Sequence, residues 1–260
     1  MKSDYKNWIP KIMLSAFLLL PFLALIFLAV FLLFTEGTVR IVLSIAAAIA
    51  LLFSLAAALW CLYAYRAFSY DGKRRLSAAI IEGTASYIKL PGGGKVLDVG
   101  CGSGALAIAV AKRNPEASVI GVDRWGLEYA SYSLPLCLKN AASEGVKNVT
   151  FQKGDAVHLD FPDESFDAVT SNYVYHNITG KDRQALLLET LRLLRKGGTF
   201  AIHDIMSPRR YGDMKAFVKK LYDMGYEKVE LIDTADGLFM TRREAAFLML
   251  GGSTLLAGKK

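Results

Sequence analysis

The sequence has few residues of the kinds that crosslink a chain or bind metal. It contains only three cysteines, Cys61, Cys101 and Cys137, and no C-x-x-C pair. Thiols scattered in this way provide neither a disulfide framework nor the paired ligands of a structural zinc site. We therefore expect no disulfide and no metal site. Cys101 lies in a glycine-rich loop, where a small side chain fills space.

The sequence also lacks internal repeats, and it lacks low-complexity tracts outside two apolar runs near its start. No basic stripe with interleaved aromatic residues is present, and no nucleic-acid-binding module is visible. The net charge is nevertheless +7. A cluster at residues 73–75, Lys-Arg-Arg, follows the second apolar run, and such a cluster attracts anionic lipid headgroups. The charge therefore indicates a membrane surface, and we expect no nucleic-acid partner.

Charged side chains are absent from residues 12–34 and again from residues 41–65. Each run exceeds the ~20 residues that cross a hydrocarbon core. A cleaved signal peptide would need a small-residue cleavage site, which residues 35–38 do not provide. A buried core hairpin would show a polar face on each helix, and neither run has one. We predict two transmembrane helices within an N-terminal membrane anchor over residues 1–66.

The cations around the two runs predict their orientation. Lys2, Lys6 and Lys11 precede the first run, and Arg66 and the 73–75 cluster follow the second. The loop between the runs contains only one cation, Arg40. By the positive-inside rule, both termini and the region that follows should be cytoplasmic in a multi-pass protein of the cell membrane.

Residues 67–94 read as a linker and a capping helix, and strands and helices then alternate over residues 95–260. The predicted strands are 95–99, 118–123, 149–152, 166–171, 199–204, 228–233 and 253–257. The predicted helices are 103–113, 126–144, 181–195, 212–223 and 241–250. Alternation of this kind is typical of an α/β fold, in which helices cover both faces of a mainly parallel sheet.

Glycines occupy positions 100, 102 and 104, directly after the apolar strand 95–99. A loop without Cβ atoms turns sharply and lets backbone N–H groups approach a ligand at the start of a helix. The loop is therefore of the nucleotide-binding type. Gly100, Gly102 and Ala105 also satisfy the dinucleotide pattern G-x-G-x-x-G/A, so the loop alone leaves the nucleotide open.

Three acids narrow the choice of the nucleotide that the loop binds. Asp98 lies inside the strand before the loop, Asp123 ends the second strand, and Asp155 follows the third. With the segments 165–172 and 194–204 in order behind them, these features resemble the class I S-adenosylmethionine (SAM)-dependent methyltransferases, of the type 11-like kind. The resemblance covers about residues 69–258. It implies a Rossmann-like seven-stranded sheet that ends in an antiparallel strand.

The resemblance also implies which residues bind SAM: Asp98, Gly100, Cys101, Gly102, Gly104, Asp123, Arg124, Trp125, Asp155, Ala156 and Asn172. Asp98 would lie near the ammonium group and Asp123 would bind both ribose hydroxyls, because a carboxylate can accept two hydrogen bonds. Asp155 would meet the adenine amine. Simpler roles remain open, because Asp123 could cap a helix, Asp155 could sit in a plain turn and Trp125 could be a packing residue.

The reacting centre in this family follows the fourth strand, which here corresponds to residues 171–178. His176 is the best candidate for a general base, because an imidazole accepts a proton near neutral pH. Asn172 could position an acceptor atom. His203 and Asp204 end the fifth strand at the same rim, and only one of them should enter the site, since neighbouring strand residues point to opposite faces. Structural roles for His176, Asn172 and His203 remain open.

The favoured function is a membrane-anchored SAM-dependent methyltransferase that acts on a small hydrophobic or lipid acceptor at the cytosolic face. The D/N-P-P-Y signature of many amine methyltransferases is absent, as is the cysteine set expected of arsenic methylation. Two alternatives remain: a NAD(P)-dependent reductase on the same fold, and a non-catalytic ligand-binding scaffold. Asp98 and Asp155 count against the reductase. The acceptor and the oligomeric state remain open.

Overall fold

The computed structural model describes residues 2–126 and 131–260, and its contacts divide the chain into two compact units. One unit is the segment Asn7–Ser77. The other combines the first residues of the chain, Met1–Lys6, with Ala78–Lys260. The chain therefore leaves the larger unit after six residues and returns to it more than seventy residues later.

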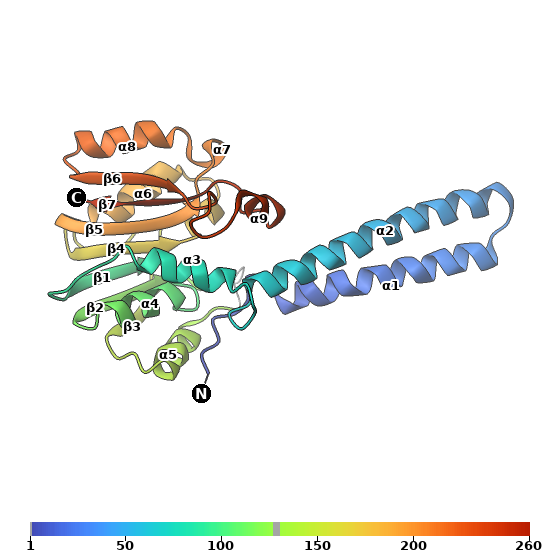
Figure 1. The fold of residues 1–260 in the computed structure, drawn as a ribbon, viewed down its shortest axis with the longest axis horizontal. Helices are drawn as coiled ribbons and strands as arrows, with labels where there is room; N and C mark the ends of the chain where they lie inside the picture. The colour runs from blue at the N-terminus through green and yellow to red at the C-terminus, as the bar shows by residue number, and fades with distance from the viewer. Residues whose placement is uncertain (1, 127–130) are drawn as a thin grey trace. The chain divides into compact units, whose positions relative to one another are not determined.

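The smaller unit contains the helices α1 (Lys11–Phe34) and α2 (Gly37–Phe68), which pack against each other as a hairpin (Figure 1). Both are long and apolar enough to cross a membrane. Large apolar side chains are exposed along both helices, including Phe34 on α1 and Phe53 on α2. A core helix of a soluble protein would bury such side chains, so this exposure supports the predicted spans. Helix α2 extends beyond the predicted 41–65 at both ends.

The larger unit is a seven-stranded sheet with helices on both faces, as predicted (Figure 1). In chain order its elements are α3 (Leu76–Ala85), which begins in the smaller unit, β1 (Gly94–Val99), α4 (Ala105–Arg113), β2 (Ala117–Asp123), α5 (Leu134–Ser143), β3 (Val149–Lys153), β4 (Phe166–Asn172), the short 3-10 helix η2 (Tyr175–Asn177), α6 (Arg183–Arg192), β5 (Leu194–Ile205), α7 (Pro208–Tyr211), α8 (Met214–Asp223), β6 (Lys228–Asp233), α9 (Arg242–Phe247) and β7 (Ser253–Lys259).

The strand order is β3-β2-β1-β4-β5-β7-β6, and β7 runs antiparallel to both of its neighbours. This confirms the predicted antiparallel last strand. Several helix predictions were too long, among them 241–250, where α9 covers only Arg242–Phe247. Residues 194 and 195 belong to β5 and not to the preceding helix, and α5 begins only at Leu134, behind a Ser133 cap. Residues 127–130 of the predicted helix 126–144 lie outside the described residues.

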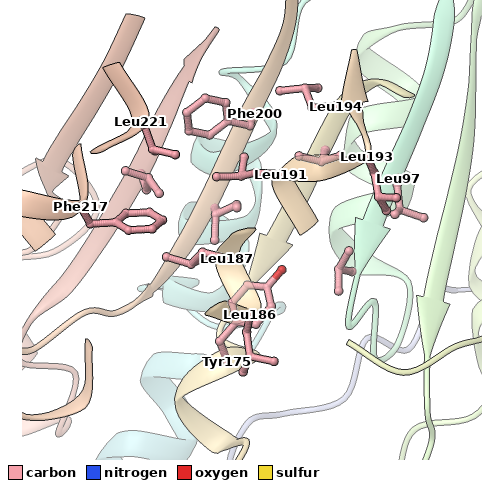
Figure 2. Close-up of a cluster of buried hydrophobic side chains, with 14 of the residues drawn as sticks. Leu97, Tyr175, Leu186, Leu187, Leu191, Leu193, Leu194, Phe200, Phe217 and Leu221 are labelled. Atoms are coloured by element: carbon pink, nitrogen blue, oxygen red, sulfur yellow. The ribbon is translucent and has the colours of Figure 1, made fainter. Parts of the chain in front are cut away.

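Two apolar cores hold the layers together. On one face, Leu97 of β1 and Phe200 of β5 pack against leucines of α6 and against α8 (Figure 2). On the other face, small and branched residues of α4 pack against α3, α5 and the strands. Burial of both sheet faces explains why the central strands read as continuous apolar runs instead of alternating ones.

Candidate active site

Strand register brings the candidate residues to one edge of the sheet. In β1, Val99 lies opposite Val122 of β2 and Ser171 of β4, and in β4 Asn172 lies opposite His203 of β5. The loops that follow these parallel strands therefore emerge side by side at the carboxyl edge. Ligands of open α/β sheets bind at this edge.

The three glycines of the loop after β1 differ in what surrounds them. All three have positive φ angles, which favour glycine. A Cβ on Gly100 would lie 2.3 Å from Val174, and one on Gly104 would lie 2.9 Å from the Phe151 ring. At Gly102 the nearest atom, on the Tyr132 ring, is 3.7 Å away. Gly100 and Gly104 thus allow close packing, while a Cβ at Gly102 would make only an ordinary van der Waals contact with the Tyr132 ring.

Asp123, at the end of β2, holds this loop in place through hydrogen bonds. Its Oδ2 accepts a hydrogen bond from the Gly102 amide at 2.8 Å, and its Oδ1 accepts one from the Trp125 amide at 2.7 Å. The Trp125 indole N–H donates to the Gly102 carbonyl at 2.9 Å. A carboxylate has about four acceptor sites, so Asp123 retains capacity for hydroxyl donors. Arg124, between Asp123 and Trp125, is exposed.

Asp98 lies beneath the loop and is 1% exposed. The Thr170 hydroxyl donates to its Oδ1 at 2.9 Å. Burial raises the pKa of Asp98 to about 7, although hydrogen bonds from Thr170 and the Ala107 amide oppose the shift. The nearby charge of Asp123 adds to it. A cation close to Asp98 would therefore change its protonation near neutral pH.

Asp155 and Ala156 follow β3, next to Asp123. The Gly154 amide donates to the Asp123 carbonyl at 3.0 Å, and this bond joins the two loops. Asp155 is exposed, and its Oδ1 accepts the Val157 amide at 2.9 Å, which is the geometry of a turn. Ala156 is partly buried against the core beneath the sheet edge.

His176 and Asp204 are paired across the loops after β4 and β5. The His176 Nδ1 bonds to the Asp204 Oδ1. The Asp204 carboxylate is fully buried, and its Oδ2 accepts the Tyr175 amide at 2.9 Å and the His176 amide at 3.2 Å. Because a carboxylate only accepts, Nδ1 carries the proton and Nε2 is left as an acceptor. This is the arrangement of an oriented general base.

His203, in contrast, is fully buried and uses both ring nitrogens. Nδ1 lies 2.8 Å from the Asn172 Oδ1, and Nε2 lies 2.8 Å from the Thr234 hydroxyl. Burial lowers the pKa of His203 to about 3, so the ring is neutral at physiological pH. This placement favours a positioning role for His203, which holds Asn172 at the end of β4, over proton transfer.

Tyr173 contacts the rings of both His176 and His203. Its ring lies edge-on to His203 at 4.7 Å and to His176 at 5.9 Å between centroids, and its hydroxyl lies 2.6 Å from the Ser253 hydroxyl. Its φ angle is +54°, which costs energy for a residue with a side chain. Trp125, at +45°, has the same strain at the end of β2. Strained residues therefore follow β2 and β4, on both sides of the glycine loop.

Comparison with known proteins decides the family. A family model described as a methyltransferase domain matches residues 91–234. The chain belongs to this methyltransferase family. Its residues 91–234 form a methyltransferase domain of the class I, SAM-dependent type.

Among the relatives of this methyltransferase, a demethylmenaquinone methyltransferase of Roseiflexus castenholzii is 33% identical over 127 residues, 49% of each chain. A ubiquinone/menaquinone biosynthesis C-methyltransferase of Desulfotalea psychrophila is 31% identical over 64% of this chain and 60% of that protein. A sterol 24-C-methyltransferase of Gibberella zeae is 33% identical over 49% of this chain and 32% of its own length. The chain spans about half the length of the curated relatives that it matches first.

Solved structures confirm the fold of the methyltransferase. Geranyl diphosphate methyltransferase, crystallised with GPP and sinefungin, aligns over 75% of this chain and 81% of its own with a TM-score of 0.54 at 18% identity. The cyclase SpnF aligns over 72% and 82% with a TM-score of 0.54 at 19% identity. At such identities the likeness shows the fold alone.

Sequence reasoning about this methyltransferase missed two contributors to the site. Asp204 was recognised as a rim residue but not as the partner of His176, because the contact joins loops after different strands. Tyr173 lies in the segment 171–178 that was assigned to the reacting centre, but nothing in its sequence context indicates a positive φ angle. The adjacency of β4 and β5 was the available signal for Asp204, since their carboxyl ends must meet.

Proposed function

We propose that SAM lies along the carboxyl edge in the order of the strands. Adenine would lie at Asp155 and Ala156 after β3, the ribose at Asp123 after β2, and the methionine part on the glycine loop after β1. The order of the loops along the edge supports this arrangement.

The residues present fit the charges of SAM. Bound SAM supplies a methyl group on a positively charged sulfonium, next to an ammonium group. Asp98 and Asp123 are the acids nearest the loop, and a cation beside Asp98 would offset the burial that disfavours its charge. The nonpolar surroundings of Cys101 and Phe151 limit water behind the loop.

His176 is the proposed base, and its bond to the buried Asp204 is the observation that carries this assignment. The methyl acceptor must be placed in line with the leaving sulfur, and it must lose a proton when it is a hydroxyl or a ring carbon. His176 Nε2 would take that proton, and Asp204 would stabilise the resulting imidazolium. Asn172, held by His203, would position the acceptor.

The acceptor is proposed to be a hydrophobic, membrane-resident molecule of the quinone or sterol kind. Relatives whose names specify menaquinone and sterol substrates support this class. The carboxyl edge of the described fold supports it independently. Leu238, Phe247 and Met249, in the segment between β6 and β7, are large apolar side chains exposed at that edge.

The proposed location is the cytosolic face of the cell membrane, with two spans and both termini inside. The cations that flank the hairpin support this orientation. The fold of the larger unit supports it as well. Because Met1–Lys6 and Ala78–Lys260 belong to one compact unit, both ends of the hairpin would lie on the same side of the bilayer.

Calorimetric titration of the full chain in nanodiscs tests this function first. We expect S-adenosylhomocysteine to bind with micromolar affinity, and NADH and NADPH not to bind. The second step is transfer of labelled methyl from SAM to demethylmenaquinone or a sterol in the same nanodiscs. Binding of a nicotinamide alone would overturn the cofactor assignment. Transfer only to water-soluble acceptors would overturn the membrane-resident substrate.

A further inference from the structure

The side chain of Asn140, on α5, connects the start of the chain to the glycine loop. Asn140 is fully buried. Its Oδ1 accepts the Asp4 amide at 2.7 Å, and its Nδ2 donates to the Asp4 carbonyl at 3.0 Å. The same Nδ2 donates to the carbonyl of Ser103 at 2.9 Å. Ser103 lies between Gly102 and Gly104, so one amide group joins the N-terminal segment to the loop.

Neighbouring residues hold the N-terminal segment in this position. The Ser3 hydroxyl donates to Glu144 at 2.7 Å, and Glu144 is also paired with Lys112 at 2.8 Å. Tyr5 packs against the apolar core behind the loop, and burial and the charge of Glu144 raise its pKa. Asp4 then caps a turn by accepting the Lys6 amide at 3.1 Å.

We infer that Ser3, Asp4 and Tyr5 form a clasp that acts through Asn140, a positioning residue, to hold the glycine loop in its SAM-binding shape. Without the clasp, the Asn140 amide would lose two of its three partners and be opened to water. The carbonyl of Ser103 would then no longer be fixed from behind.

This inference rests on the proposed placement of SAM at the glycine loop. It concerns affinity for the cofactor, and it is independent of the acceptor and of the proton transfer by His176. Loss of one buried hydrogen bond of this type changes a binding constant by about fivefold to tenfold. We therefore expect S-adenosylhomocysteine to bind about five to ten times more weakly when the clasp is disrupted.

The test is titration of S-adenosylhomocysteine into full-chain protein in nanodiscs. One variant deletes residues 3–5, which removes the backbone amide and carbonyl of Asp4 that bind Asn140 but keeps the lysines that flank the first span. The second variant is Asn140→Ala. Combining them should weaken binding no further than either alone, because both break the same connection.

Asn114 provides the matched control. It is also a buried asparagine that accepts one amide, from Leu90 at 2.7 Å, and donates to two carbonyls, those of Ile88 and Val110. It lies at the end of α4, at the opposite edge of the sheet from the glycine loop. Asn114→Ala should lower the melting temperature as much as Asn140→Ala while leaving S-adenosylhomocysteine affinity within twofold of the original.

Each outcome has a clear meaning. Unchanged affinity in the variant that lacks residues 3–5 would overturn the clasp, and so would equal losses of affinity in Asn140→Ala and Asn114→Ala. The deletion leaves every strand and helix of the larger unit unchanged in sequence, so it remains informative if Asn140→Ala does not fold. Failure of the unaltered protein to bind S-adenosylhomocysteine would instead count against the proposed function.

Discussion

His176 gains a defined role only through its partner. The ring is oriented by Asp204, whose second oxygen is held by two backbone amides, so the free Nε2 has a fixed direction. We expect His176→Ala to lower the rate of methyl transfer by about 10²-fold, which is typical of a lost general base. Affinity for S-adenosylhomocysteine should stay within twofold. Single-turnover transfer of labelled methyl and calorimetry measure the two quantities.

Asp204→Asn is the control for that prediction. It replaces the acceptor of the Nδ1 proton and should lower the rate as His176→Ala does, with no further loss when both changes are combined. Full activity in His176→Ala would remove this residue from the mechanism. An additive double variant would show that the two side chains act separately.

Asp123 should matter for binding and not for the chemical step. Asp123→Ala removes the proposed ribose acceptor and also the two hydrogen bonds to Gly102 and Trp125. We expect affinity for S-adenosylhomocysteine to fall by more than tenfold, while the rate at saturating SAM changes little. Asp123→Asn keeps one acceptor oxygen and should lose less. Wild-type affinity in Asp123→Ala would place the ribose elsewhere.

Asp98 predicts a specific dependence of stability on pH. Its folded pKa of about 7 lies above the unfolded value, so the folded state binds more protons between pH 4 and 7. The stabilisation of the folded state that results from this raised pKa is fully present below about pH 4. It is lost as the pH rises through about 7, and it amounts to roughly 4 kcal/mol. The melting temperature of Asp98→Asn relative to wild type should therefore rise over this range. A constant difference would mean that Asp98 titrates normally.

At the scale of elements, the glycine loop and the segment after β4 are packed as one structure. Gly100→Ala should place a methyl group against Val174 and lower the melting temperature by several degrees. Val174→Ala should recover part of this loss, because it removes the clashing carbons. The same second change should not help Gly102→Ala, where the nearest atom is 3.7 Å away. Thermal unfolding of the four variants measures this coupling.

Local patterns were enough to predict most elements. All seven strands, the antiparallel β7 and the glycine loop followed from apolar periodicity, turn residues and the family resemblance. The order of the acids Asp98, Asp123 and Asp155 was likewise readable, because each lies close to the end of a strand or follows one. These features depend on residues that are close together in the chain.

Contacts between distant residues were not readable in this way. The sequence does not bring Asp204 to His176 until β4 and β5 are known to be neighbours, and it gives no reason to place Asp4 on Asn140. Similarly, Leu194 continues the apolar spacing of the helix before it, so the start of β5 was assigned to that helix. Only the pairing with Phe166 of β4 shows the strand.

At the scale of the whole molecule, the segment between β6 and β7 should contact the membrane surface. It exposes Leu238, Phe247 and Met249 at the carboxyl edge, and Arg243 is exposed beside them. Apolar side chains with nearby arginines suit an anionic lipid interface.

Cysteine labelling tests this last expectation. Met249 is 75% exposed, whereas Met224, 54% exposed, follows α8 at the opposite edge of the sheet. The three native cysteines are buried, so Met249→Cys and Met224→Cys can each be labelled with a polarity-sensitive fluorophore. In nanodiscs with anionic lipid, we expect emission from position 249 to shift to shorter wavelength and to be quenched by spin-labelled lipid, and emission from 224 to do neither. Equal behaviour at both positions would mean that this edge does not face the bilayer, and the acceptor would then have to reach the site through water.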